Sequence, residues 1–154
     1  MPKKITAREI YTTSIFAVLF NLLTDLYLDV KYDWYSYFEI GVQWVYIPLI
    51  FGLFPALSVI FLSQYPFSKK MRYKVYYIMA WTLFGVVYEW LSIKTGMLYH
   101  NGWTILYSAV SYPIILIILV INLQITRKLK FIVSPLFIIK SSIRHLLHNY
   151  AVLI

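Results

Sequence analysis

The chain has 154 residues, of which 61% are hydrophobic and 13% are charged, and its formal net charge is +8. A soluble domain holds roughly 45–50% apolar and about 25% charged residues, so this composition excludes an ordinary soluble domain and indicates one membrane-embedded domain. The basic residues stand in short clusters beside apolar runs, a pattern that excludes nucleic acid as a partner. The absence of cysteine from the sequence excludes disulfides, thiolate catalysis and cysteine-bound metals.

Four apolar stretches approach the roughly 20 residues that a helix needs to cross a bilayer. They lie at about residues 10–28, 42–62, 75–93 and 103–125. Backbone groups in hydrocarbon must bond to each other, and barrel-like alternation is absent, so all four are expected to be helices. The first is too long and too polar in places for a signal peptide, and we expect it to be retained. The sequence therefore predicts an all-α fold, an integral membrane four-helix bundle, within a domain of residues 1–130.

Lysine and arginine residues are distributed unevenly along the chain. Three precede the first apolar stretch, four lie in the segment 63–74 and five follow residue 126, whereas the other two connections hold only Lys31 and Lys94. Basic residues mark the cytoplasmic side of a membrane protein. The charge distribution therefore predicts a multi-pass protein of the cell membrane with both termini in the cytoplasm (N-in, C-in).

Prolines interrupt the second and fourth stretches. Pro48, Pro55 and Pro113 each remove a backbone donor, and we expect kinks that fit these helices to their neighbours. Transporters use broken helices around their substrate sites, but the paired breaks or internal repeat typical of them are not found in the sequence.

The segment 131–154 has an amphipathic pattern. Its apolar face holds Leu136, Ile139, Ile143, Leu146, Leu147, Tyr150 and Ile154, and its polar face holds Lys140, Ser141, Arg144, His145 and His148. This pattern predicts a C-terminal amphipathic interfacial helix on the inner membrane surface, after a break at Pro135. The two histidines have no third ligand nearby, so we expect no metal there.

Aromatic residues gather at the ends of the stretches that are predicted to face outward. They are Tyr27, Tyr32, Trp34, Tyr35, Tyr37, Phe38, Trp44, Tyr46, Trp90, Tyr99, Trp103 and Tyr107. Such rings suit the headgroup level of a bilayer, which predicts an interfacial belt. The alternative is a vestibule that binds lipid or another amphiphile.

Two carboxylates fall inside the predicted spans, where charge is costly and usually functional. At ~1.5 Å rise per residue, Asp25 lies roughly 9 Å outside the middle of the first span, and Glu89 lies roughly 7–8 Å outside the middle of the third. The two are therefore predicted to face each other in an outward-facing polar pocket. Asn21, Asp25 and Asp29 are four residues apart, so a regular helix places them on one face. The flanking candidates are Asn21, Thr24, Tyr107 and Ser108, and those at the pocket mouth are Asp29, His100 and Asn101, with His100 expected to be solvated.

Three interpretations of this pocket remain open. Adjacent carboxylates in low dielectric cannot both ionise cheaply, so such a pair tends to hold a proton, a cation or an amine-bearing ligand. In the leading interpretation, the protein is therefore a binding or transport-related component. The alternative is a structural or accessory subunit, in which the carboxylates hold helices together and the partner is another membrane protein or a second copy. An intramembrane enzyme with Asp25 and Glu89 as an acid/base pair is the third. Enzyme, phosphate-binding and metal-ligand motifs are absent from the sequence, so no catalytic residue, metal or cofactor is expected.

Four motifs carry a resemblance to a known family. They are Asn21-x-x-Thr24-Asp25-x-Tyr27-Leu28-Asp29-x-Lys31-Tyr32-Asp33, Tyr88-Glu89-Trp90-Leu91-Ser92-x-Lys94-Thr95-Gly96, Asn101-Gly102-Trp103 and Tyr112-Pro113. Over about residues 15–130 the chain resembles a family of small uncharacterised multi-pass membrane proteins of spore-forming Gram-positive bacteria. The resemblance implies a bacterial plasma membrane location; it implies no reaction, ligand or partner.

Overall fold

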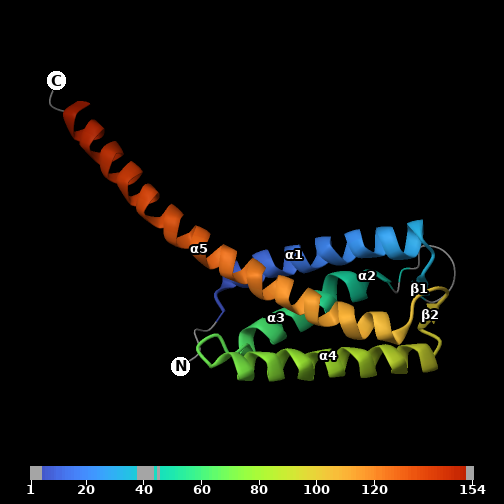
Figure 1. Ribbon diagram of the computed structural model, residues 1–154. Coiled ribbons are helices and arrows are strands. Elements are labelled where there is room, and N and C mark those ends of the chain that lie inside the picture. The colour runs from blue at the N-terminus through green and yellow to red at the C-terminus, as the bar shows by residue number, and fades with distance from the viewer. Residues whose placement is uncertain (1–4, 38–43, 45, 152–154) are drawn as a thin grey trace.

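The computed structural model describes residues 5–37, 44 and 46–151, from 130 onward as backbone. Four helical segments make up most of the described chain (Figure 1). They are α1 (Ala7–Asp25) with its continuation η1 (Leu26–Lys31); α2 (Tyr46–Pro48), η2 (Leu49–Leu53) and α3 (Phe54–Gln64) as one bent segment; α4 (Met71–Lys94); and α5 (Ile105–Ala151). Two short strands, β1 (Tyr35–Tyr37) and β2 (Leu98–His100), pair with each other. The prediction of four helices is confirmed, and the strands are an unpredicted addition.

Two described helical stretches are long and apolar enough to cross a membrane, Ala7–Lys31 and Ile105–Leu129. They correspond to the first and fourth predicted spans. The second predicted span corresponds to a shorter apolar helix, Leu49–Gln64. The third corresponds to α4, which has 24 residues but carries basic side chains at both ends. Length and composition therefore support a membrane location through two of the four helices.

The bend in the second segment follows from its prolines. Pro48 precedes the π-helical turn η2 (Leu49–Leu53), and Pro55 follows it at the start of α3. A proline cannot donate to the preceding turn, so the helix widens locally instead of continuing as a regular α-helix. The predicted kink thus coincides with η2, while residues 42, 43 and 45 of the predicted span lie outside the described part of the chain.

One ion pair ties α1 to α5 near the start of the chain. Glu9 forms a capping box with Thr6, whose backbone N–H donates to Glu9 Oε2 at 2.8 Å. The other carboxylate oxygen accepts from Arg127 Nε at 3.0 Å, although the two residues are 118 positions apart. The Arg127 guanidinium also lies 4.7 Å from the ring centre of Phe67, in the connection between α3 and α4. Three parts of the chain therefore meet at this end of the bundle.

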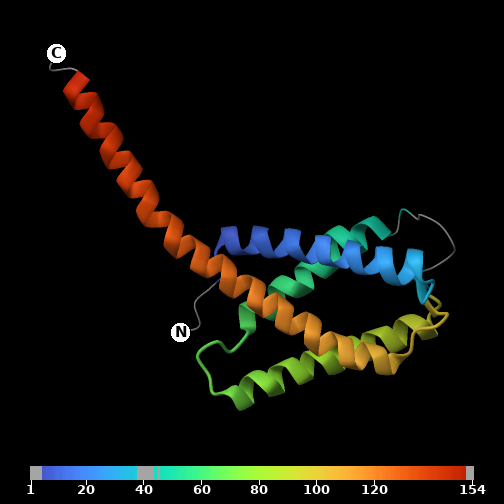
Figure 2. The ribbon, with the colours of Figure 1, turned by 45° about the horizontal axis from the view of Figure 1, so that its top comes forward.

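The helices pack unevenly. α1 contacts α3 and α5, and α4 packs along α5. Near the α3–α4 connection, Tyr77 OH donates to the Phe61 carbonyl at 2.8 Å, and the Phe61 and Trp81 rings lie 5.6 Å apart. From there α3 and α4 spread apart toward the strands (Figure 2). The result is a wedge whose narrow end is held by aromatic contacts.

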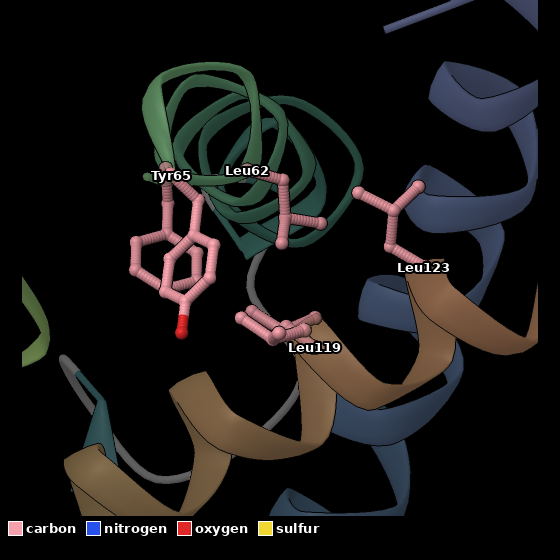
Figure 3. Close-up of a cluster of buried hydrophobic side chains, with 6 residues drawn as sticks. Leu62, Tyr65, Leu119 and Leu123 are labelled. Carbon is pink, nitrogen blue, oxygen red and sulfur yellow. The ribbon is translucent and has the colours of Figure 1, made fainter. Parts of the chain in front are cut away.

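The apolar core fills the narrow half of this wedge. Leu62 and Tyr65, from the end of α3 and the residue after it, face Leu119 and Leu123 of α5 (Figure 3). Leu123 has no exposed surface, and Leu62 is 1% exposed. Phe61 and Leu119 belong both to this cluster and to the lining of a cavity on its wide side. The core is therefore the floor of that cavity.

The last helix is longer than predicted. α5 has 47 residues, from Ile105 to Ala151, and runs through both Pro113 and Pro135. The predicted break at Pro135 is therefore wrong; a proline removes one backbone hydrogen bond, and a helix accommodates that loss by bending. The second half of α5 curves away from the bundle and projects beyond it (Figures 1 and 2). The proposed 130/131 boundary falls within this helix, and the faces predicted for 131–154 lie outside the described side chains.

Candidate functional site

A cavity of about 460 Å³ lies in the wide half of the wedge. Its walls come from α1, α3, α4 and α5, and the two strands contribute residues as well. Most of the lining is apolar and aromatic, including Phe20, Phe61, Trp81, Phe84 and Leu119. Both carboxylates singled out in the sequence, Asp25 and Glu89, are also lining residues.

Asp25 lies at the junction of α1 and η1 and is 8% exposed. One carboxylate oxygen accepts from Asn21 Nδ2 at 2.7 Å, one turn earlier on the same helix. The other accepts from the hydroxyl of Tyr35 in β1 at 2.6 Å. Each oxygen thus has a neutral donor, an arrangement suited to the acceptor-only, ionised carboxylate.

Glu89 lies on α4 and is 4% exposed. Its Oε1 accepts from Ser108 Oγ at 2.6 Å, and its Oε2 accepts from the Tyr112 hydroxyl at 2.5 Å. Ser108 and Tyr112 are one turn apart on α5. The carboxylate is therefore held between the two helices by two hydroxyl donors.

Trp103 determines the direction of the Ser108 hydrogen bond. Its indole N–H donates to Ser108 Oγ at 2.6 Å. An indole nitrogen is a donor only, so the serine oxygen accepts there and its own hydrogen goes to Glu89. The Trp103 ring also contacts Tyr35 edge to face, with centroids 6.2 Å apart. One aromatic residue therefore joins the Glu89 group of residues to the Asp25 group.

The small sheet brings the two carboxylates to the same end of the cavity. β1 and β2 are antiparallel, with Tyr35 opposite His100 and Tyr37 opposite Leu98. Opposed residues of antiparallel strands project to the same face. These four residues all line the cavity, whereas Tyr99, which alternates with them, is half exposed. Of the central pair, Tyr35 donates to Asp25, and His100 Nε2 lies 3.0 Å from Glu89 Oε1.

The contact between His100 and Glu89 is close but not aligned as a hydrogen bond. His100 Nε2 has no hydrogen-bond partner among the described residues, although it lies 3.0 Å from the carboxylate oxygen. The pair is an ion pair only when the imidazole is protonated. The His100 side chain is 14% exposed. The expectation of a solvated loop histidine is therefore wrong, because β2 turns the side chain inward.

The position of Tyr112 depends on a glycine. A Cβ atom at Gly85 would lie 3.1 Å from two carbons of the Tyr112 ring. Gly85 is one turn before Glu89 on α4, so its missing side chain leaves room for the ring beside the carboxylate. The tyrosine hydroxyl can then reach Glu89 from α5.

The cavity has acidic side chains without a permanent cation. Among the described residues that line it, none is lysine or arginine. The two basic residues of this end lie over aromatic rings instead: Lys31 Nζ is 5.2 Å from the centre of Tyr27, and Lys94 Nζ is 6.0 Å from that of Trp90. His100 is the lining residue that is able to carry a positive charge. No group of three histidine, aspartate or glutamate side chains in the described part of the chain is arranged to hold a metal ion.

The structure brings together most of the residues singled out in the sequence. Asn21, Thr24, Asp25, Glu89, Ser108 and His100 line the cavity. Tyr107 does not; it is 54% exposed, because it is one position, and therefore about a quarter turn, away from Ser108 on α5.

Asp29 and Asn101 also lie outside the lining. Asp29 belongs to η1 (Leu26–Lys31) and is partly buried, so of the three polar residues predicted to share one face only Asn21 and Asp25 line the cavity. Asn101 is exposed and donates to Asp33 Oδ1 at 3.0 Å.

Three residues of the site, Tyr35, Trp103 and Tyr112, are not among the candidates that the sequence indicates for this role. The sequence places Tyr35 and Trp103 in the aromatic belt, and Tyr112 belongs only to the Tyr112-Pro113 motif. The four-residue spacing of Ser108 and Tyr112 is a signal that indicates a shared helix face. The alternation of Tyr35 and Tyr37 about Ser36 is compatible with a strand. Comparison with protein-family models, with curated proteins and with solved structures finds no match to this chain.

Proposed function

We propose that this chain is a multi-pass membrane protein that binds a small ligand in the cavity between its helices, as a binding or transport-related component. The observation that carries the proposal is that two buried carboxylates from different helices, Asp25 and Glu89, line one cavity of about 460 Å³. That volume is within the ~300–1,000 Å³ of ordinary small-ligand sites. An apolar lining with a few convergent polar groups is also typical of such sites.

The distribution of polar and apolar side chains supports a membrane environment. Large apolar residues such as Leu19, Leu83 and Leu106 are exposed, at 55%, 65% and 76%. Charged and polar residues, including Glu9, Asp25 and Glu89, are buried. In water the first group would be costly to expose and the second costly to bury. A hydrocarbon solvent accounts for both.

The positions of the charges support an orientation with both termini in the cytoplasm. The start of α1, the connection 65–70 and the middle of α5 lie at one end of the bundle, and the strands lie at the other (Figure 1). Arg8, the cluster 69–74, Arg127 and Lys128 belong to the first end. By the positive-inside rule that end faces the cytoplasm, and the cavity then opens in the outer half of the membrane.

A cavity-filling substitution tests the proposal. Ser58 lines the cavity, and Ser63, on the same helix, is exposed; each hydroxyl donates only to a nearby backbone carbonyl. We expect protein purified from native membranes to retain one lipid or small molecule, detected by mass spectrometry of the extract. Ser58→Phe should abolish its retention, and Ser63→Phe should leave it unchanged. Equal retention by the wild type and both variants, or retention by none of them, would contradict a binding function for this cavity.

The alternative is an accessory subunit of a membrane complex. It is favoured by the second half of α5, which projects beyond the bundle without a described neighbour (Figures 1 and 2). A helix of this length that projects beyond the bundle offers a surface to another membrane protein or to a second copy of the chain. The same purification distinguishes this case, because a stoichiometric protein partner would then be recovered, with the Ser58→Phe protein as well as with the wild type.

A further inference from the structure

We propose that the ligand is a single-chain amphiphile with a primary-amine head group, which reaches the cavity from the bilayer. This inference rests on the proposed function and names the chemical class of the ligand. The ammonium group lies between Asp25 and Glu89, and the apolar chain extends toward the cavity floor at Phe61 and Leu119.

The first argument is charge. Asp25 and Glu89 are each arranged as acceptors, with one hydroxyl or amide donor on every carboxylate oxygen. No described lining residue is lysine or arginine, so no side chain with a permanent positive charge stands beside either carboxylate. His100 adjoins Glu89 alone, and even a protonated His100 would balance one of the two carboxylates. A buried carboxylate without a cation is costly. A cationic ligand would supply the positive charge that the lining residues do not supply.

The second argument is the number of hydrogen bonds that remain available. An ionised carboxylate has about four acceptor positions. The contacts described above use two of them on Asp25 and two on Glu89, besides the close approach of His100. An ammonium group has three donors and no acceptor, which matches the remaining positions. The rings of Trp103 and Tyr35 stand at the same end and favour a cation over a neutral head group.

The third argument is the shape and composition of the rest of the cavity. Away from the carboxylates its walls are aromatic and aliphatic, with Phe20, Phe61, Trp81, Phe84 and Leu119 among them. A volume of about 460 Å³ is within the range of sites for drug-sized ligands and far exceeds the ~10–15 Å³ that one water molecule needs. A long-chain amine fills the apolar part of such a cavity, whereas an ion or a short amine leaves it empty.

The fourth argument is the route of access. Phe84 and Tyr88 line the cavity and are also 51% and 39% exposed, so the cavity reaches the lateral surface of the bundle beside α4. α3 and α4 spread apart on this side (Figure 2). The exposed surface there is apolar, so the opening faces lipid rather than water. A ligand that already partitions into the bilayer therefore has the shortest path to the carboxylates.

The test uses the full chain in nanodiscs of phosphatidylcholine and three probes with the same chain length: n-dodecylamine, dodecanol and dodecanoate. Complexes are counted by native mass spectrometry. We expect one dodecylamine per chain, bound at least about 10-fold more tightly than dodecanol or dodecanoate. Asp25→Asn and Glu89→Gln should each weaken dodecylamine binding by about 10-fold to 100-fold, the cost of one charge-assisted hydrogen bond.

A matched control is Asp33→Asn. Asp33 is an acidic residue of the same end, lies outside the cavity lining and has a φ of 51°, which asparagine tolerates. This substitution should leave dodecylamine binding unchanged, which excludes attraction of the amine to surface charge. Binding of dodecanol by the carboxylate variants shows that they are folded. If they do not fold, the preference of the wild type among the three probes decides whether the head group is an amine.

The other outcomes each contradict the inference. Equal binding of the three probes, or amine binding that survives both carboxylate substitutions, would show that the head group is not an amine. The cavity would still be a ligand site in that case, provided that Ser58→Phe abolishes binding. Failure of all three probes to bind would also contradict the amphiphile class, and the native-membrane extract would decide separately whether the cavity binds anything.

Discussion

The contact between Glu89 and Tyr112 depends on Gly85, and we call these three residues the Gly85–Glu89–Tyr112 unit. Gly85 leaves room for the Tyr112 ring, and the ring places its hydroxyl 2.5 Å from Glu89 Oε2. The sequence indicates that Gly85 and Glu89 lie on one face of a helix, since they are one helical turn apart. It contains no signal for the contact with Tyr112, which is 23 residues from Glu89 on another helix.

Removal of the tyrosine hydroxyl tests this unit. We expect Tyr112→Phe to lower the free energy of unfolding by about 1–2 kcal/mol, because a buried carboxylate loses one of its two hydroxyl donors. Thermal unfolding in a mild detergent, followed by circular dichroism, measures the change. Tyr107→Phe is the control, since Tyr107 is 54% exposed and outside the lining. An equal effect of the two substitutions would show that the Tyr112 hydroxyl has no special role.

The strand β2 depends on the way α4 ends. Gly96 has a φ of 72°, and its N–H donates to the Ile93 carbonyl at 3.2 Å. The Met97 N–H donates to the Ser92 carbonyl at 2.9 Å, which completes a Schellman motif. This turn directs the chain into β2 and so brings His100 opposite Tyr35. The helix end is therefore connected to the site through one glycine.

A side chain at Gly96 should weaken both the end of α4 and the start of β2. Gly96→Ala is expected to lower the free energy of unfolding by about 1–2 kcal/mol, because non-glycine residues are strained at positive φ. The added Cβ would also lie 3.2 Å from the Tyr99 hydroxyl. Gly52→Ala is the matched control, since a Cβ there meets nothing within 4 Å. Chemical denaturation of the two variants in the same detergent measures the difference, and a Gly96→Ala protein as stable as the Gly52→Ala protein would contradict the assignment.

The whole molecule is arranged with basic clusters at one end and the strands at the other (Figure 1). The antiparallel course of the four helices places every second connection at the same end. The Glu9–Arg127 ion pair holds the basic end together, and the Tyr35–His100 pairing closes the other. The molecule is therefore asymmetric in charge along its length.

Single cysteines test the orientation, since the chain contains none of its own. Thr104 and Ser68 are exposed and lie at opposite ends of α4 and its connections. In intact cells, an impermeant maleimide should label Thr104→Cys, and Ser68→Cys should react only after the membrane is permeabilised. The reverse pattern would invert the orientation. Labelling of both residues from outside would contradict an arrangement that crosses the membrane.

The helices and the charged ends follow from the sequence, because each depends on local composition and periodicity. The predicted stretches 10–28 and 75–93 accordingly fall within Ala7–Lys31 and Met71–Lys94.

The contacts of the carboxylates depended on the tertiary structure. Tyr35 and His100 meet across a sheet of three-residue strands, which are too short for periodicity to predict. Trp103 and Tyr112 reach the site only because α4 packs along α5. The hydrogen bonds from Tyr35, Ser108 and Tyr112 to the carboxylates join residues 10, 19 and 23 positions apart. Side-chain periodicity carries no information about which helices become neighbours.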